Sequence, residues 1–136
     1  PFSIALMDLD GFKAVNDRCG HIEGDRLLKE LALLTQSQIR KVDLLARWGG
    51  DEFIVLVLSD LQEAKTVAER IRKSIEDSSF SDTSIQEDDP RKAVTTSIGI
   101  TQYQKDDTLD RITHRADKAL YTIKARGGNG ILVAEN

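Results

Sequence analysis

The sequence predicts an α+β domain in which helices pack against one mixed, five-stranded β-sheet. Short apolar segments of strand length are bounded by Gly, Pro and Asp, and longer segments between them carry apolar residues at helical spacing. The elements follow one another in the order β, two helices, β-hairpin, α, β, α, β. This order contains the β-α-β-β-α-β pattern of ferredoxin-like folds, whose strands form a single sheet with helices packed against it.

The first half of the chain predicts one strand, two helices and a hairpin. Residues 2–7 are an apolar strand that ends at an acidic cluster, and a polar stretch, residues 11–24, follows with room for a short helix. Asp25 is a suitable N-cap for the long helix after it, because its side chain can accept from the first free N–H groups. Residues 43–48 and 53–58 are two strands, and the paired Gly49 and Gly50 between them favour a hairpin turn with positive φ.

The second half predicts a helix, a strand, another helix and a short closing strand. Apolar residues lie on one face of a helix over residues 61–75, and a polar stretch with Pro90, residues 78–91, is a surface loop. Residues 93–101 form the fourth strand. A helical stripe runs from Leu109 to Ile123 and ends at two glycines, and residues 131–134 form the fifth strand.

Composition excludes several classes of protein. The 136 residues suit one domain, residues 1–136, and 19 Lys and Arg against 23 Asp and Glu argue against a dedicated nucleic-acid binder. A single cysteine, Cys19, excludes an internal disulfide, and no apolar run approaches the ~20 residues of a membrane-spanning helix. The chain starts at Pro1, so we expect a domain excised from a longer multidomain protein.

Three carboxylates are expected to meet at one end of the sheet. Asp8 ends the first strand, and Asp51 and Glu52 lie in the hairpin turn, beside which a split β-α-β sheet can place that strand. Mg²⁺ prefers oxygen ligands and takes one or two carboxylates plus substrate phosphates. Lys13 could supply a cation to a triphosphate at a helix N-terminus. The alternatives are a solvated turn for the carboxylate pair and a helix-cap role for Asp10.

Other phosphate-binding and metal-binding motifs are absent or incomplete. The sequence has no Walker A loop, and residues 8–11 begin like a calcium loop whose later ligand positions hold Phe12 and Cys19 instead of oxygen donors. His21 and His114 have no Cys or His partners at zinc spacing, so we interpret both as structural.

Several blocks of residues resemble the GGDEF domain family. They occur in the family's order and spacing and cover essentially the whole chain: DLDGFK at 8–13, ND at 16–17, GH at 20–21, GD at 24–25, RWGGDEF at 47–53, SIGI at 97–100 and RADKALY at 115–121.

The resemblance implies a fold like the palm of nucleotidyl cyclases and polymerases, and diguanylate cyclase activity. Members of the family condense two GTP into cyclic di-GMP (c-di-GMP) and release two pyrophosphates, with two domains facing each other as a homodimer. The implied partners are GTP, c-di-GMP as product and inhibitor, a second GGDEF domain and an upstream sensory or regulatory domain, but no nucleic acid. The implied location is the cytoplasm, either free or as part of a membrane-anchored bacterial sensor.

By resemblance, the metal site is Asp8 and Asp51 with the Leu9 carbonyl, holding Mg²⁺ or alternatively Mn²⁺. Glu52 completes the acidic signature, and Asp51, Glu52 and Lys13 are the catalytic candidates. The substrate-binding candidates are those that match the family's guanine and phosphate positions: Phe12, Lys13, Asn16, Asp25, Gly49, Gly50 and Lys124. An amide and a carboxylate suit the acceptors and N–H donors of guanine, and the glycines let a phosphate approach the backbone.

Arg40 and Asp43 match the family's RxxD inhibitory site, where product binds. Arg40 lies nine residues ahead of Gly49, and its guanidinium can fork two hydrogen bonds to a phosphate or a guanine edge. The alternative is a solvated charge pair at a helix end.

The chain also departs from the family pattern. Gly128 stands where many members carry a phosphate-binding arginine, four residues after the lysine that aligns with Lys124, and Arg126 is a nearby substitute. A segment resembling DxLTGLxNR before the first strand is absent. These departures favour an alternative hypothesis: a catalytically weak or inactive module that binds GTP or c-di-GMP and regulates a neighbouring domain.

Overall fold

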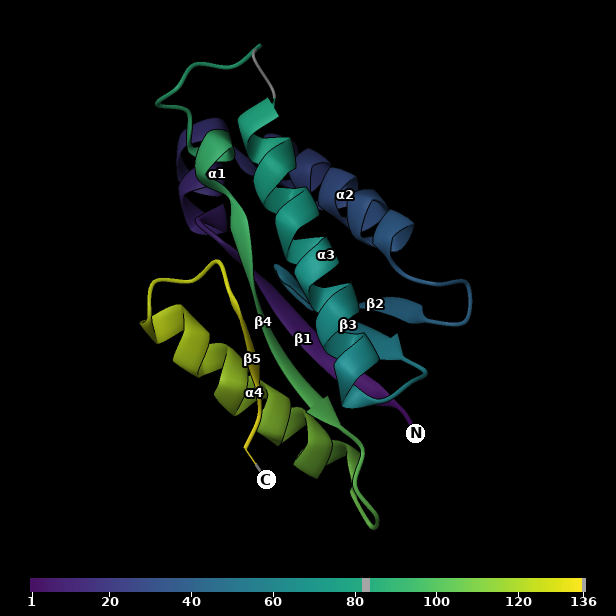
Figure 1. Ribbon diagram of the computed structural model, residues 1–136. Coiled ribbons are helices and arrows are strands. Elements are labelled where there is room, and N and C mark those ends of the chain that lie inside the picture. The colour runs from purple at the N-terminus through teal and green to yellow at the C-terminus, as the bar shows by residue number, and fades with distance from the viewer. Residues whose placement is uncertain (82–83, 136) are drawn as a thin grey trace.

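The strands of this computed structural model form one sheet within the residues that it describes, 1–81 and 84–135. The strand order is β2-β3-β1-β4-β5 (Figure 1). The elements in chain order are β1 (Ser3–Asp10), α1 (Phe12–Cys19), α2 (His21–Gln38), β2 (Leu44–Gly49), β3 (Glu52–Val57), α3 (Leu61–Ser81), the 3₁₀ helix η1 (Pro90–Ala93), β4 (Thr95–Gln102), α4 (Leu109–Ala125) and β5 (Ile131–Val133).

The sheet is mixed, as predicted. Central β1 pairs antiparallel with β3 and β4, β2 pairs antiparallel with β3, and β5 alone among the described strands runs parallel to its neighbour β4. The register sets Asp8 opposite Glu52 on one side and opposite Ser97 on the other. The end of β1 therefore lies beside the start of β3, where the hairpin turn is.

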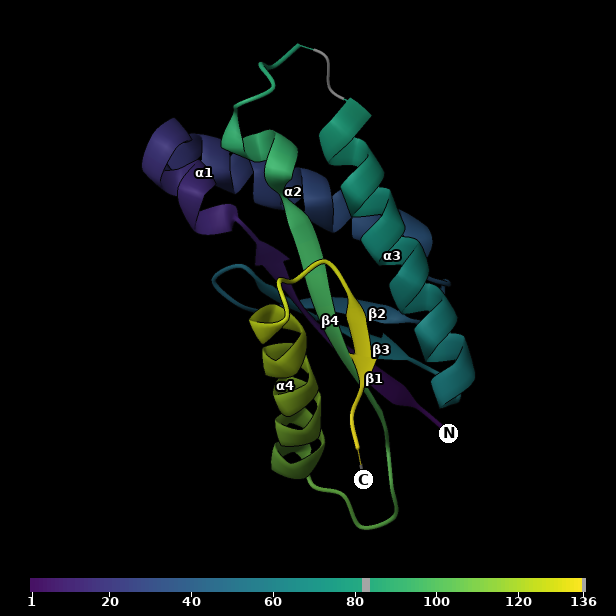
Figure 2. The same ribbon diagram turned by 60° about the vertical axis from the view of Figure 1, so that its left-hand side comes forward.

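Helices cover both faces of the sheet. In Figures 1 and 2, α2 and α3 lie on one face and α4 crosses the other. Alternate residues of β1 serve the two layers: Ala5, Met7 and Leu9 belong to the core under α2 and α3, whereas Ile4 and Leu6 pack with α4. Because β1 is buried on both faces, its sequence is a continuous apolar run rather than an alternating one.

Several local predictions were wrong. Helix α2 begins at His21 directly after Gly20, whose φ is +89°, so Asp25 lies inside the helix rather than at its N-cap. Neither Gly49 nor Gly50 has positive φ; the turn residues are Gly50 and Asp51, and the strand register shifts just before them, between Arg47 and Gly49.

Helix α3 is longer than predicted. It extends to Ser81, so the first part of the predicted loop at 78–91 is helical, and residues 82–83 of that prediction lie outside the described part of the chain. Ion pairs at helical spacing, Arg72–Glu76 and Lys73–Asp77, stabilise the second half of this helix. Among residues 1–81 and 84–135, no helix has both the length and the apolar character required to cross a bilayer.

Candidate active site

The three predicted carboxylates lie at one edge of the sheet. Asp8 is near the end of β1, Glu52 opens β3 directly opposite it, and Asp51 occupies the turn between β2 and β3. The backbone N–H of Leu9 donates to the Asp51 carbonyl over 3.3 Å, which ties the turn to the end of β1. The juxtaposition expected from the topology is therefore confirmed.

Lys124, from the last turn of α4, reaches into this acidic edge. Its Nζ lies 3.3 Å from Asp8 Oδ2, 3.0 Å from Asp10 Oδ1 and 3.3 Å from the Leu9 carbonyl oxygen. Asp8 Oδ1 is buried and has no hydrogen-bond partner among the described residues. Burial raises the pKa of Asp8 to about 6; Lys124 opposes that rise and the neighbouring Asp51 adds to it.

Asp10 is an acceptor for β4 and for the turn after α4, not a helix cap. The N-cap of α1 is Gly11, with φ +80° and no side-chain cap bond. Asp10 instead accepts from the hydroxyls of Thr95 and Ser97, both over 2.8 Å, and from the Asn129 backbone N–H over 2.9 Å. Burial opposes ionisation, but these donors outweigh it and lower the pKa of Asp10.

A pocket of about 350 Å³ opens beside Asp51, between α1, α2 and the hairpin. Most of its lining residues were named from the sequence as substrate-binding candidates. The lining comprises Phe12, Lys13, Asn16, His21, Asp25, Leu28, Arg47, Gly50 and Asp51.

The Asn16 side chain lies on the surface of α2 at Gly24. A Cβ atom at Gly24 would be 1.9 Å from Asn16 Oδ1 and 3.3 Å from the ring of Phe12. Only glycine at this position leaves room for the carboxamide, so Asn16 and the first turns of α2 form one packed unit.

Sequence reasoning assigned no site role to Arg47, His21 or Leu28. The Arg47 guanidinium donates to the Gly50 carbonyl from both Nε (3.0 Å) and Nη2 (2.6 Å), which holds the hairpin turn against the pocket. His21 was interpreted as structural, but it is exposed and lines the pocket. Its position next to Gly20, at the α1–α2 junction that also carries Asn16 and Asp25, was the available signal.

The two candidate phosphate-binding lysines lie in different surroundings. Lys13 lines the pocket with a side chain that is 92% exposed and 3.6 Å from Asp17 Oδ2, whereas Lys124 is held among the carboxylates. A Cβ at Gly50 would meet no atom within 4 Å, so the fold does not require glycine there and the backbone is open to a ligand.

The donor set suits a hard divalent cation. Asp8 offers an orphaned buried oxygen, Leu9 a carbonyl, and Asp51 a carboxylate close enough to raise the pKa of Asp8. No group of three or more His, Cys, Asp or Glu side chains in the described part of the chain forms a complete protein cage for a metal ion. Two carboxylates and a carbonyl fit an ion whose remaining ligands come from water and phosphate.

Comparison with known proteins identifies the family. A family profile described as "Diguanylate cyclase, GGDEF domain" matches residues 1–130. The chain belongs to the GGDEF family.

Curated relatives of this GGDEF chain include named diguanylate cyclases. Diguanylate cyclase A of Treponema denticola is 43% identical over 136 residues, which cover 98% of this chain and 35% of the relative. Response regulator PleD of Caulobacter vibrioides is 39% identical over 134 residues, which cover 97% of this chain and 29% of the relative. The chain thus spans about a third of the length of these proteins.

Solved GGDEF structures have the same fold. The diguanylate cyclase SiaD of Pseudomonas aeruginosa, solved with its activator SiaC, superposes with a TM-score of 0.85 at 36% identity, covering 98% of this chain and 50% of that one. The coiled coil and GGDEF domain of DgcB from Caulobacter crescentus, solved with c-di-GMP, gives a TM-score of 0.87 at 28% identity, covering 98% and 69%.

The RxxD pair lies away from the pocket, in the turn before β2. Asp43 is buried and accepts from the Arg40 backbone N–H, Nε and Nη2, each over 3.1 Å, and from the Leu58 N–H over 3.0 Å. Arg40 also donates to the Leu58 carbonyl over 3.2 Å. Asp43 is therefore a structural acceptor in this state, while the Arg40 side chain, 39% exposed, retains a face open to a ligand.

Gly128 is incompatible with the arginine of many GGDEF domains in this conformation. Its φ is +76°, and a Cβ there would be 2.8 Å from the Asp10 carboxylate. Arg126 does not replace that arginine at the acidic edge, because it lines a groove formed by α4, β5 and the residues after β5.

Proposed function

We propose that residues 1–136 are the catalytic domain of a longer diguanylate cyclase, which condenses two GTP into c-di-GMP and releases two pyrophosphates. Each domain binds one GTP, and two domains face each other in a homodimer. Each 3′-hydroxyl loses its proton and forms a bond to the α-phosphate of the other GTP, whose bond to pyrophosphate breaks.

The observation that carries this proposal is the contiguity of the acidic edge and the pocket. Asp51 belongs to both: it lines the pocket with Asn16 and Asp25, and it adjoins Asp8 at the end of β1. A base held by Asn16 and Asp25 therefore has its phosphates directed toward groups suited to a metal-assisted nucleotidyl transfer.

Within the pocket, the proposed roles follow from the chemistry of each side chain. The Asn16 amide donates to a guanine acceptor, and the Asp25 carboxylate accepts from guanine N–H groups. Phe12 packs against the base. Lys13, exposed at the pocket, pairs with the terminal phosphates, and the backbone at Gly49 and Gly50, open at Gly50, contacts the α-phosphate.

At the acidic edge, Asp8, the Leu9 carbonyl and Asp51 hold Mg²⁺, for which Mn²⁺ can substitute. When bound, the ion neutralises phosphate charge and favours the deprotonated 3′-hydroxyl. Glu52, opposite Asp8, completes the negative site, and Lys124 supplies a second cation on its phosphate side.

The test is a turnover assay on the purified domain at high concentration with GTP and Mg²⁺, with c-di-GMP detected by chromatography. Asp51→Ala should abolish product, and Asp77→Ala, which removes an exposed carboxylate paired with Lys73 on α3, should not. Product from the Asp51 variant would refute the metal assignment. A version dimerised through a fused coiled coil separates a weak dimer from an inactive site.

The proposal includes product inhibition at Arg40, with the domain regulated by an upstream segment of the longer protein. We place the domain in the cytoplasm, where GTP is available. The exposed face of Arg40 provides forked donors for a phosphate of c-di-GMP.

The second candidate is a GGDEF module that binds GTP or c-di-GMP without turnover. It is favoured by Gly128, which leaves the phosphate side without the arginine that many family members carry. A dimerised domain that binds GTP and yields no c-di-GMP would favour this candidate over the cyclase.

A further inference from the structure

We propose that the loop of residues 86–93, which contains η1, is a brace that fixes the position of Asn16 and Asp25 relative to the rest of the pocket, with Arg91 and Glu23 as positioning residues for guanine recognition. The inference rests on the proposed guanine-binding roles of Asn16 and Asp25. It adds two residues outside the pocket, on which base selectivity depends.

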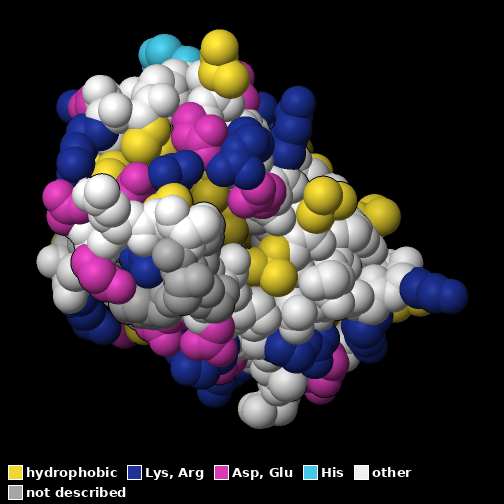
Figure 3. All heavy atoms as spheres, turned by 90° about the horizontal axis from the view of Figure 1, so that it is seen from above, with side chains coloured by type: hydrophobic (Ala, Val, Ile, Leu, Met, Phe, Trp, Pro, Cys, Tyr) yellow, Lys and Arg dark blue, Asp and Glu magenta, His cyan; other side chains and the backbone are white. Residues whose placement is uncertain are grey.

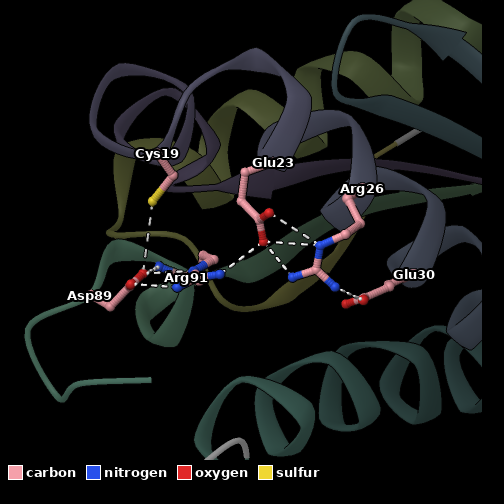
Figure 4. Close-up of polar contacts among 6 residues, drawn as sticks. All are labelled: Cys19, Glu23, Arg26, Glu30, Asp89 and Arg91. Carbon is pink, nitrogen blue, oxygen red and sulfur yellow. Dashed lines mark hydrogen bonds and ion pairs between the residues drawn. The ribbon is translucent and has the colours of Figure 1, made fainter. Parts of the chain in front are cut away.

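The brace contacts the α1–α2 junction at three points, two of which are drawn in Figure 4. Arg91 Nη1 donates to Glu23 Oε1 over 2.8 Å, in the first turn of α2, and Cys19 Sγ lies 4.0 Å from Asp89 Oδ1. The third contact is made by Arg18 Nη1, which donates to the Asp88 carbonyl over 3.1 Å. One short segment, about 70 residues further along the chain, therefore holds both the end of α1 and the start of α2.

Arg91 is itself fixed within the brace. Asp89 caps η1 by accepting from the Arg91 backbone N–H over 2.9 Å, and its carboxylate binds the Arg91 guanidinium over 3.0 and 2.7 Å. Only 23% of the Arg91 side chain is exposed. A guanidinium locked by one carboxylate presents its remaining N–H groups to Glu23 at little further cost in side-chain entropy.

The start of α2 has no side-chain cap of its own. Its N-cap, Gly20, provides no side-chain cap bond, so the side chains that hold the first turn from outside the helix come from the brace. Glu23 also binds Arg26, but that pair lies within α2 and moves with the helix. Figure 3 shows basic and acidic side chains adjoining one another on this face of the molecule.

The first turn of α2 directly determines where the pocket residues Asn16 and Asp25 lie. Gly24 follows Glu23 and carries the Asn16 carboxamide on its surface, and Asp25, the next residue, lines the pocket. A shift of the first turn of α2 therefore moves Asp25 and displaces Asn16 together. Misplacing a recognition group by about 1 Å is enough to weaken its interaction severely.

The experiment compares two arginines that bind the same carboxylate. Arg91→Met removes the ion pair between η1 and α2, whereas Arg26→Met, the matched control, removes two ion pairs inside α2, with Glu23 and Glu30. Affinities for 3′-deoxyGTP, which cannot react, and for 3′-deoxyITP, which lacks the exocyclic amine of guanine, are measured by calorimetry. The KM and kcat of GTP are measured in parallel on the dimerised domain.

Arg91→Met should weaken 3′-deoxyGTP binding by about 10-fold and reduce the preference for guanine over hypoxanthine, with KM rising and kcat nearly unchanged. Arg26→Met should change these quantities by less than about twofold. Glu23→Gln should match Arg91→Met, the double variant should lose no more than either single variant, and Arg91→Lys should restore part of the affinity.

Unchanged affinity and selectivity in folded Arg91→Met and Glu23→Gln would overturn the brace. Equal losses in Arg91→Met and Arg26→Met would also overturn it, because the effect would then follow Glu23 and not η1. Dimerised wild-type domain that binds 3′-deoxyGTP but makes no c-di-GMP from GTP would refute only the proposed catalysis, and the binding measurements would still test the brace. Wild-type domain that binds no guanine nucleotide would refute both.

Discussion

Replacing Asp43 with Ala should destabilise the fold far more than replacing its partner Arg40. Asp43 is 2% exposed and accepts four hydrogen bonds, three from Arg40 and one from the Leu58 backbone N–H. Removing one partner of a buried ion pair typically costs about 3–5 kcal/mol, and leaving a buried N–H unpaired costs about 1–3 kcal/mol. Because Arg40 can turn toward water, we expect a loss near the low end, about 3 kcal/mol.

Arg40→Ala should cost much less than Asp43→Ala, because Asp43 keeps the two backbone donors and the lost guanidinium was 39% exposed. Urea denaturation of both variants at pH 7 measures the difference. Burial opposes ionisation of Asp43, but the Arg40 and Leu58 donors lower its pKa, so its contribution is present above the unfolded value of about 3.9 and lost as pH falls. The gap between wild type and Asp43→Ala should therefore narrow in acid.

Equal stability of wild type and Asp43→Ala would refute this reasoning. The outcome also decides how the proposed inhibitory site can be probed. Arg40→Ala should relieve inhibition by added c-di-GMP without lowering the initial rate. In an Asp43 variant, a change in inhibition could not be separated from the loss of stability. Undiminished inhibition in folded Arg40→Ala would exclude Arg40 from the site.

The raised pKa of Asp8, about 6, makes protons compete with a divalent ion, so calorimetric Mn²⁺ affinity should fall between pH 7 and pH 5. The stability of the metal-free domain should depend on pH in the opposite direction to Mn²⁺ affinity. The folded pKa of Asp8 lies above its unfolded value, so Asp8 stabilises the fold at low pH, and this stabilisation is lost as pH rises through about 6, which urea titrations would detect. Gly128→Arg should destabilise by about 2 kcal/mol without increasing turnover, because φ there is +76° and a Cβ approaches Asp10; a more active variant would contradict this. Gly99→Ala should cost about 3 kcal/mol in thermal melts, since its Cβ would lie 2.2 Å from the Ala116 carbonyl oxygen; an unchanged melting temperature would show that β4 and α4 can separate.

The fold could be predicted from sequence because its main signals are local. The apolar run of β1 is buried on both faces, and the stripe of α4 from Ile112 to Ile123 packs on the sheet, so each element carries its own pattern. The meeting of Asp8 with the hairpin followed from topology alone. Predictions that depended on one residue's cap or turn chemistry were less secure: Asp25 has the side chain of a helix cap, but α2 already begins at His21, after Gly20.

Individual side-chain contacts between distant segments could not be predicted from sequence. Lys124 reaches the Leu9 carbonyl across 115 positions, and Asn129 reaches Asp10 across 119, because α4 packs on β1 and the following turn closes over its end. Nothing in the sequence near Arg91 indicates that its partner is Glu23, 68 positions away. Such pairs are fixed by the relative placement of whole elements, for which residue types give no local signal.

The acidic edge has an excess of negative charge that Lys124 only partly balances. One ammonium group contacts Asp8 and Asp10, and Asp51 adds a further carboxylate nearby, so the edge attracts a cation while its lysine is already engaged. The donors of Asp10 in β4 and at Asn129 lower its pKa and keep it charged independently of Lys124. Asp10 therefore anchors the ammonium while Asp8 keeps an oxygen free, and this difference between the two carboxylates explains how a lysine can lie beside a metal site without closing it. It also gives Gly128 a positive role: without a side chain, it lets the Asn129 N–H reach Asp10, which an arginine in this conformation would obstruct.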